Sequence, residues 1–369
     1  MTTILLIILA VAAIAKASEY WISRPVWVGG HLYQYPQLKV KPAGSFMIAA
    51  LLTLFTGLRA GFNDTTNYRI GFNKLATGWE AITRQSFSLG DHPGFAIYQV
   101  ALKTWISDNS QTLIFTSSLI TIFCFIFFDQ AWSRKFSLSA YLFITTGLLY
   151  FTMAAMKQVL AMSIGLCAIH CLLKRKTIPF LLLLLLAATF HPYVLLFGLG
   201  YFLKEKVWTQ KVVLLLILAT VSGIYMSQFL EIALTTIATV GKKYDLREFE
   251  GRGVNNLRFL VHCVTPAMSF MYRGAINKSR DTVTILCSNF SVVTLAFMVL
   301  ALFGSANMFA RMATYFLPFS NIATANIIVN YVPVKYRSPV FWGCVGGYFF
   351  FCMYLFATNS SYQYKSIFH

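Results

Sequence analysis

Long apolar runs recur through the chain, and they constrain its fold more than any other feature. Runs of about 16–25 residues separate charged clusters, and an α-helix needs about this length to cross the hydrocarbon core of a bilayer. Hydrophobic residues make up 57% of the 369 residues, whereas charged residues make up only 11%. A soluble globule cannot bury so much apolar surface. The sequence therefore predicts an all-α polytopic membrane protein that forms one integral membrane domain over residues 1–369.

The apolar runs give twelve candidate membrane helices. Their approximate limits are 2–17, 44–59, 111–131, 137–154, 158–173, 177–190, 192–203, 212–235, 257–272, 282–303, 307–332 and 339–357. The first run resembles a secretory signal, because Ala15-Lys16-Ala17 fits a cleavage site. It lacks a basic segment before the run and further spans follow it, so we expect it to be retained.

The basic residues orient these helices. The chain carries 30 Lys and Arg against 12 Asp and Glu, but it has no basic stripe with interleaved aromatic residues, so nucleic acid is not an expected partner. Lys and Arg accumulate in short cytoplasmic loops. A topology with the N-terminus outside places 17 of the 30 on the cytoplasmic side, including Arg134-Lys135 and 174–176. Residues 60–110 then form a large external loop, in which 95–106 is an interfacial or re-entrant helix, and 236–256 forms a second.

Residues 177–203 leave two alternatives, because His191-Pro192 lies in the middle of this apolar stretch. The stretch is either a hairpin of two short helices or one long span that buries His191 and inverts every later helix. We prefer the hairpin, because the dense basic clusters then lie inside. Each short helix rises only about 20 Å, against about 30 Å of hydrocarbon, which leaves a depression in the outer leaflet suited to a lipid-borne substrate.

Several ionisable residues lie where apolar helices meet the predicted external face. A charge inside the membrane costs about 2.5–3.5 kcal/mol on insertion scales, so such residues are functional hypotheses. Each also has a plainer interpretation: the cations snorkel to the interface, Asp64 caps a helix, and His191 is a turn residue. Asp91-His92-Pro93 is interpreted in the same way as a cap for the helix at 95–106. The residues that this topology brings to one face are Arg59, Asp64, Arg69, Lys157, His191 and Arg311.

This set of side chains suits the chemistry of a diphosphate. Fixed cations bind phosphate oxygens and stabilise the charge on a departing diphosphate. A carboxylate beside them suits a general base that takes a proton from an attacking sugar hydroxyl. The chain has no nucleotide-binding or protease motif and no cluster of carboxylates, and nearly all seven cysteines fall in apolar runs. We therefore expect no metal and no other cofactor.

The order of the motifs resembles the EpsG family, bacterial membrane proteins regarded as Wzy-like polymerases of exopolysaccharide repeat units. The resemblance covers residues 50 to 320, through "GLRAGFNDTTNY", "DHPGF", "MKQVLAMSI", "ATFHPYVLL" and "RMATYF". It implies a GT-C-like glycosyltransferase in the bacterial cytoplasmic membrane, with its active site on the extracytoplasmic side. Such an enzyme moves a growing glycan from undecaprenyl diphosphate onto a hydroxyl of a new lipid-linked unit.

The resemblance also implies roles for particular residues. Asp64 and His191 match motifs of the family and are the candidate catalytic residues, Asp64 as the general base and His191 as a residue that orients the substrate or shares in proton transfer. The residues implied to bind substrate or diphosphate are Arg59, Tyr68, Lys157, Gln158, Arg311 and Tyr315, and we add Arg69 because it lies just beyond the matched segment. Gly61 and Thr65 match the same segment as Asp64, with one extra residue after Gly61. Lys157 stands where the family more often has Arg, and "DHPGF" replaces a Glu-Pro-like element.

Two other classes of function stay open on the sequence. A flippase for lipid-linked oligosaccharide would also need cations facing an anionic head group, although no internal repeat typical of transporters is present. A scaffold subunit of a synthesis complex would tolerate changes at Asp64 and Arg311. The partners expected for the polymerase are an undecaprenyl-diphosphate-linked oligosaccharide, the lipid bilayer and other exopolysaccharide assembly proteins.

Overall fold

A computed structural model describes residues 2–28, 31–83, 88–225, 253–304, 306–358 and 364–368. The chain packs as two compact units, Met1–Gly198 with Val345–His369 and Leu199–Cys344. The prediction of one integral membrane domain stays a prediction, and most of the second external loop at 236–256 lies outside the described residues.

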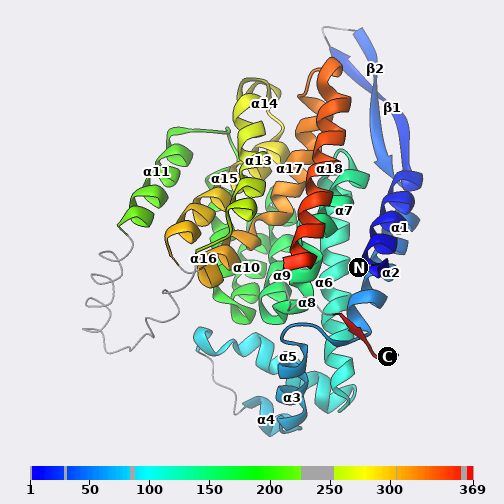
Figure 1. The fold of residues 1–369 in the computed structure, drawn as a ribbon, viewed down its shortest axis with the longest axis vertical. Coiled ribbons are helices and arrows are strands. Elements are labelled where there is room, and N and C mark those ends of the chain that lie inside the picture. Colours follow the sequence, from blue (N-terminus) through cyan, green and yellow to red (C-terminus); the bar gives the residue numbers. More distant parts are fainter. Residues whose placement is uncertain are drawn as a thin grey trace. The chain divides into compact units, whose positions relative to one another are not determined.

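The first unit contains the N-terminal helices, the short helices of residues 60–110 and the C-terminal strand (Figure 1). Its elements are α1 (Thr2–Ser18), β1 (Glu19–Val28), β2 (His31–Val40), α2 (Pro42–Gly57), β3 (Arg59–Gly61), α3 (Thr65–Lys74), α4 (Trp79–Thr83), η1 (Leu89–Asp91), α5 (Pro93–Trp105), α6 (Ser110–Trp132), α7 (Phe136–Thr145), α8 (Leu148–Ala154), α9 (Met156–Leu173), α10 (Thr177–Phe190), most of η2 (Pro192–Tyr201) and β4 (Lys365–Ser366).

The second unit contains helices joined by loops, and no strand among its described residues. Its elements are α11 (Gln210–Ile224), α13 (Asn256–Met271), α14 (Arg273–Ser279), α15 (Thr282–Phe303), α16 (Ala306–Tyr315), α17 (Leu317–Asn330) and the first part of α18 (Val334–Thr358). The buried amide of Asn289 on α15 fixes the loop before α11, because its Nδ2 donates to the carbonyls of Leu203 and Lys206 at 2.7 and 2.9 Å. A second buried polar contact joins α13 to α17, because the hydroxyls of Thr265 and Thr324 lie 2.8 Å apart.

The helices confirm a multi-pass, predominantly α-helical membrane protein. Among the described residues, four helices are long and apolar enough to cross a membrane, namely α6, α9, α15 and α18. Two further spans are possible if each of two bent helix pairs crosses as one unit. Five shorter apolar helices coincide with other predicted runs: α1, α2, α10, η2 and α11.

Two predicted continuous helices are wrong, because the chain breaks inside them. The run at 137–154 divides into α7 and α8, which meet at 51°. Gly147 adopts φ +86° at this break, a conformation that glycine accepts without strain. The run at 307–332 divides into α16 and α17, which are bent by 49°. Pro318 lies in the first turn of α17, where a helix tolerates the missing N–H of proline. In the middle of one continuous helix the same proline would remove a backbone hydrogen bond, so the helix breaks before it.

The chain reverses direction at His191-Pro192, as the hairpin interpretation predicts. The helix α10 ends at Phe190 and His191 is extended, with φ −159° and ψ 116°. A Cβ on Gly198 would lie 3.7 Å from the Leu184 side chain, so residues seven positions on either side of His191 are neighbours. The returning arm is a 3-10 helix rather than the predicted α-helix. This 3-10 helix of ten residues rises only about 20 Å, so it is too short to cross the hydrocarbon core.

A β-hairpin follows α1, in a region for which we predicted no structure. The strands β1 and β2 pair antiparallel from Glu19 opposite Val40 to Val28 opposite His31. Two strand-like runs separated by Gly29-Gly30 are a recognised sequence signal for such a hairpin. We missed the strands, although they contain aromatic and β-branched residues, because the prediction relied on the longer apolar runs on either side.

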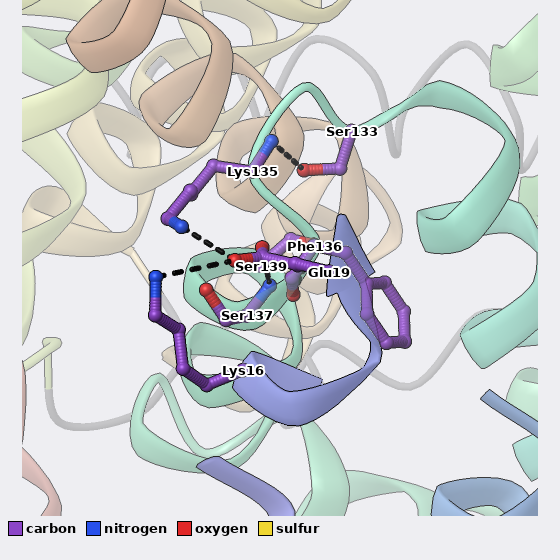
Figure 2. A network of polar contacts seen from close by, with 7 residues as sticks. All are labelled: Lys16, Glu19, Ser133, Lys135, Phe136, Ser137 and Ser139. Carbon is purple, nitrogen blue, oxygen red and sulfur yellow. Dashed lines mark hydrogen bonds and ion pairs between the residues drawn. The ribbon is translucent and has the colours of Figure 1, made fainter. Parts of the chain in front are cut away.

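The start of this hairpin is attached to the loop between α6 and α7 by a buried carboxylate (Figure 2). The side chain of Glu19 is only 1% exposed. It accepts hydrogen bonds from the Lys135 ammonium and from the backbone N–H of Ser137 at 2.8 Å. Lys16 lies 4.0 Å from the same carboxylate. This network fixes the end of α6 that lies away from Arg59 and Asp64.

Residues 60–110, which we predicted to form an external loop, contain short helices that pack on α6 and α9. The helix α5 confirms the predicted short amphipathic helix at 95–106. Its Phe95 and Leu102 belong to a buried cluster with Phe72 of α3, Leu113 of α6 and Met156 of α9. This shared apolar core places the loop against the first turns of α6 and α9.

Lys103 of α5 caps the C-terminus of α3. Its ammonium donates hydrogen bonds to the carbonyls of Phe72, Asn73 and Leu75 at 3.0, 2.7 and 2.7 Å. The last carbonyls of a helix have no partner within it, and a cation there also interacts favourably with the helix dipole. The sequence did not single out Lys103, because nothing near it indicates which carbonyls it reaches.

Replacing Lys103 with Met is expected to destabilise this loop by about 1–3 kcal/mol, because three carbonyls lose their donor. The apparent melting temperature of the protein in detergent should fall by several degrees. Lys103→Arg should retain most of the stability. Lys74→Met, at an exposed lysine in the last turn of the same helix, is the matched control. A melting temperature for Lys103→Met equal to that of Lys74→Met would contradict the capping role.

Candidate functional site

Asp64 lies at a sharp turn between β3 and α3. Asn63 adopts the left-handed conformation, with φ +45°, which Asn tolerates better than most residues. Asp64 then occupies the N-cap position of α3, but its side chain makes no capping hydrogen bond. The cap interpretation of this carboxylate therefore does not describe the structure. The half-buried carboxylate is available for another partner.

Buried hydrogen bonds between Thr65, Arg59 and the backbone fix the position of the turn that carries Asp64. Thr65 is fully buried, and its hydroxyl donates to the Phe62 carbonyl at 2.7 Å. The same hydroxyl accepts a hydrogen bond from Nε of Arg59 at 3.0 Å. The residue next to Asp64 is therefore fixed both to its own turn and to β3. This accounts for the Thr that follows Asp64 in the motif.

Arg59 lies in the protein interior rather than at the end of the second helix, where we predicted it. Its side chain is 1% exposed. Nη1 donates to the Thr56 carbonyl and to the Ser118 hydroxyl, the latter at 3.0 Å, and Nη2 donates to the Met153 carbonyl at 3.3 Å. With the bond to Thr65, four of its five N–H groups bind protein oxygens. Arg59 therefore links α2, α3, α6 and α8.

Burial, reinforced by the charge of Arg69, lowers the pKa of Arg59 to about 9. At neutral pH the guanidinium still carries its charge. Arg69 lies nearer the surface and is half-buried. Its guanidinium donates to the carbonyl of Arg59 at 3.0 Å and to the side-chain oxygen of Gln111. The Gln111 amide in turn donates to the carbonyl of Gly57, so Arg69 connects α3 to the start of α6 and the end of α2.

Aromatic side chains connect the Asp64 turn to Lys157. Tyr68 lies one turn after Asp64, and its ring packs edge-on against Phe95, with the centroids 5.9 Å apart. The ammonium of Lys157 lies 5.6 Å from the centroid of the same Phe95 ring, within the range of a cation–π contact. Lys157 is half-buried in the first turn of α9, and Gln158 beside it is 4% exposed.

Two histidines complete an arc of side chains, which runs from Asp64 through Tyr68, Phe95 and Lys157 to His92 and His191. The rings of His92 and His191 are stacked, with centroids 5.1 Å apart and an interplanar angle of 15°. Burial, and next the charge of Lys157, lower the pKa of His92, whereas Asp91 and a hydrogen bond to the Phe190 backbone raise it. The net effect is a ring that is neutral at pH 7. His92 occupies the N-cap position of α5 but makes no side-chain cap.

Gly94 permits the close approach of α5 to α10 that brings the two histidines together. A Cβ on Gly94 would lie 2.1 Å from the Thr189 hydroxyl and 2.9 Å from the Phe190 ring. The Thr189 hydroxyl is itself fixed, because it donates to the Leu186 carbonyl at 2.7 Å. The glycine in "DHPGF" is therefore required by packing against α10.

Replacing Gly94 with Ala is expected to separate α5 from α10, at a cost of about 1–3 kcal/mol for overpacking. We expect lower levels of folded protein in detergent extracts, measured by size-exclusion chromatography, and lower activity. Gly71→Ala is the matched control, because a Cβ there meets nothing within 4 Å. If Gly94→Ala behaved like Gly71→Ala, the close approach would not matter.

The first unit therefore brings together Asp64, Tyr68, Arg69, Lys157 and His191, with Arg59 behind them. Arg311 and Tyr315 belong to the second unit, on α16, and their proximity to Asp64 stays a prediction. Arg311 lies on the exposed face of α16, whereas Tyr315 is fully buried. The opposite face of this helix packs through Phe309, Ala310 and Ala313.

Sequence reasoning missed three side chains that position the site: His92, Gln111 and Ser118. We interpreted His92 only as part of a helix cap, although His-Pro occurs in both "DHPGF" and "ATFHPYVLL". That repeated dipeptide is a signal that could have paired His92 with His191. Ser118 is an ordinary residue of an apolar helix, and no pattern distinguishes it.

Comparison with known proteins identifies the family of the chain. The model of the EpsG family matches residues 45–368, which include every residue of the predicted site. No curated protein and no solved structure matches the chain significantly. The family match extends beyond the motifs, from α2 to the C-terminal strand. The chain therefore belongs to the EpsG family, which implies a multi-pass membrane protein that acts as an exopolysaccharide-related polymerase.

Proposed function

We propose that this protein joins polysaccharide repeat units by glycosyl transfer at the extracytoplasmic face of the bacterial cytoplasmic membrane. The donor is a glycan on a polyprenyl diphosphate, for which the family resemblance implies undecaprenyl diphosphate. The acceptor is a hydroxyl of a second lipid-linked unit. The proposal includes twelve membrane segments and a GT-C-like first external loop, because the described apolar helices coincide with most of the predicted runs.

One observation carries the proposal. A half-buried carboxylate without a capping bond, Asp64, lies on the same arc of side chains as a cation, Lys157, and a pair of imidazoles. A carboxylate of this kind suits a general base, and a nearby cation suits the charge of a phosphate leaving group. The stacked histidines, His92 and His191, close the arc beside Lys157.

In the proposed reaction the acceptor hydroxyl attacks the anomeric carbon of the donor glycan. A bond forms between these two atoms, and the bond from the anomeric carbon to the diphosphate oxygen breaks. Asp64 takes the proton of the hydroxyl, and the bonding electrons leave with the lipid diphosphate. Lys157 stabilises the developing negative charge, and the same role for Arg311 stays a prediction of the family resemblance. His191 orients the substrate, and Arg59 positions the Asp64 turn because its own donors are occupied by protein oxygens.

The distribution of basic residues supports the extracytoplasmic assignment. Lys157 lies at the start of α9, whereas the basic run 174–176 follows its other end. Arg69 contacts the start of α6, whereas Arg134-Lys135 follow the end of that helix. Each helix is long enough to separate its two ends by about 27–35 Å. Because clustered Lys and Arg favour the cytoplasm, the Asp64 end of both helices faces outside.

The test is reconstitution of the purified protein with lipid-diphosphate-linked repeat units of the source bacterium. The proposal expects longer glycans on the lipid carrier, without added nucleotide. A deletion strain should accumulate single lipid-linked units that are accessible from outside the cell. Accumulation of these units inside would instead indicate a flippase. Unchanged polymer in the deletion strain would reject both functions.

A further inference from the structure

We propose that the C-terminal strand completes the substrate site and that Lys365 contacts the phosphates of the lipid-linked substrate. The inference rests on the proposed function and adds a binding residue outside the motifs that suggested the family. It also gives the C-terminal end of the chain a definite role. The pairing of β4, the contacts of Tyr364 and the environment of Lys365 support this role.

The strand β4 pairs antiparallel with β3, the segment that leads to Asp64 (Figure 1). Ser366 lies opposite Arg59, and Lys365 lies opposite Gly61. The N–H of Ile367 donates to the carbonyl of Leu58 at 3.0 Å. The last described residues of the chain are therefore attached by backbone hydrogen bonds to the segment that holds the proposed base.

Tyr364 attaches the strand to α2 on the N-terminal side of Lys365. The Tyr364 hydroxyl donates to the carbonyl of Phe55 at 2.8 Å, and the two rings stack with centroids 4.5 Å apart. With Ile367 on Leu58, the strand is held on both sides of Lys365. The side chain of Lys365 therefore projects from a defined position rather than from a loose terminus.

The stem of Lys365 lies against Gly61, three residues before Asp64. A Cβ on Gly61 would lie 3.7 Å from both Cβ and Cδ of Lys365, so the missing side chain leaves room for the lysine stem. The side chain is exposed, and among the described residues its ammonium makes no ion pair. Because the donors of Arg59 are occupied by protein oxygens, Lys365 offers an accessible charge on this flank. An exposed ammonium on a fixed stem suits phosphate oxygens.

Binding of undecaprenyl diphosphate, without a glycan, tests the proposal directly. The full-length protein is placed in phosphatidylcholine nanodiscs with increasing undecaprenyl diphosphate, and retained lipid is counted by native mass spectrometry. Loss of one charge-assisted contact should weaken binding by about tenfold in Lys365→Gln. Lys365→Arg should bind like the wild type. Lys176→Gln, at an exposed lysine in the turn after α9, is the matched control and should bind normally.

Two results would overturn the inference. The first is wild-type affinity in Lys365→Gln. The second is equal competition by phosphatidylglycerol, which would make the site one for general anionic head groups. Tyr364→Phe keeps the ring but removes the hydrogen bond to Phe55, so it should weaken binding less than Lys365→Gln. If the wild type bound undecaprenyl diphosphate through Lys365 but did not extend glycans, the proposed function would fail while the phosphate contact stood. Normal glycan extension with unchanged binding in Lys365→Gln would reject the contact alone.

Discussion

Replacing Asp64 with Asn should lower the rate of glycan extension by about two to four orders of magnitude, the usual contribution of a general base. The change keeps the size and the N-cap position of the side chain but removes its ability to accept the proton. Because the Asp64 carboxylate makes no capping hydrogen bond, we expect normal amounts of folded protein. Extension is measured on reconstituted protein with lipid-linked repeat units, and folding is measured by size-exclusion chromatography.

Two further variants make this prediction specific. Asp64→Glu keeps a carboxylate one methylene farther from the turn, so it should retain part of the activity. Glu80→Gln removes an exposed carboxylate from the same segment, residues 60–110, and should change neither activity nor folding. Full activity in a folded Asp64→Asn protein would exclude Asp64 as the general base.

The sequence predicts well those helices whose apolar runs end at clear signals. The predicted run 282–303 coincides with α15, because Asp281 caps its first turn and Gly304 follows its last. The limits of α6 and α10 are also within two residues of the prediction. Breaks inside apolar runs are less visible. Gly147 and Pro318 lie within continuous hydropathy, and only the backbone shows that the helix bends there.

The candidate site was predictable as a set of residues but not as a set of contacts. A charged residue beside an apolar helix either contacts substrate or supports the fold, and the sequence alone cannot distinguish these two roles for Arg59. The tertiary contacts distinguish them, because its guanidinium meets oxygens from residues as distant as Ser118 and Met153. The stack of His92 on His191 likewise depends on the hairpin and on Gly94. Pairing of β4 with β3 joins opposite ends of the chain, which local patterns do not encode.

Replacing Arg59 with Met should reduce the amount of folded protein sharply. The change removes the hydrogen bonds to Thr56, Thr65, Ser118 and Met153. Each buried polar group that loses its partner costs about 1–3 kcal/mol, so the total loss should exceed 3 kcal/mol. The expected result is aggregation on detergent extraction, or a melting temperature far below that of the wild type.

Arg59→Lys separates a positioning role from a direct contact with diphosphate. If Arg59 only supplied charge to the substrate, the lysine variant would fold normally and would lose part of its affinity for the lipid diphosphate. If Arg59 positions the turn, lysine should also fold poorly, because one ammonium cannot reproduce the geometry of a planar guanidinium that reaches four elements. Arg273→Met, at an exposed arginine that donates to the Phe270 carbonyl, is the control for loss of a charge. Normal folding of Arg59→Lys with weakened lipid binding would therefore favour the direct contact, whereas poor folding of both Arg59 variants would show that this arginine holds together the elements around the Asp64 turn.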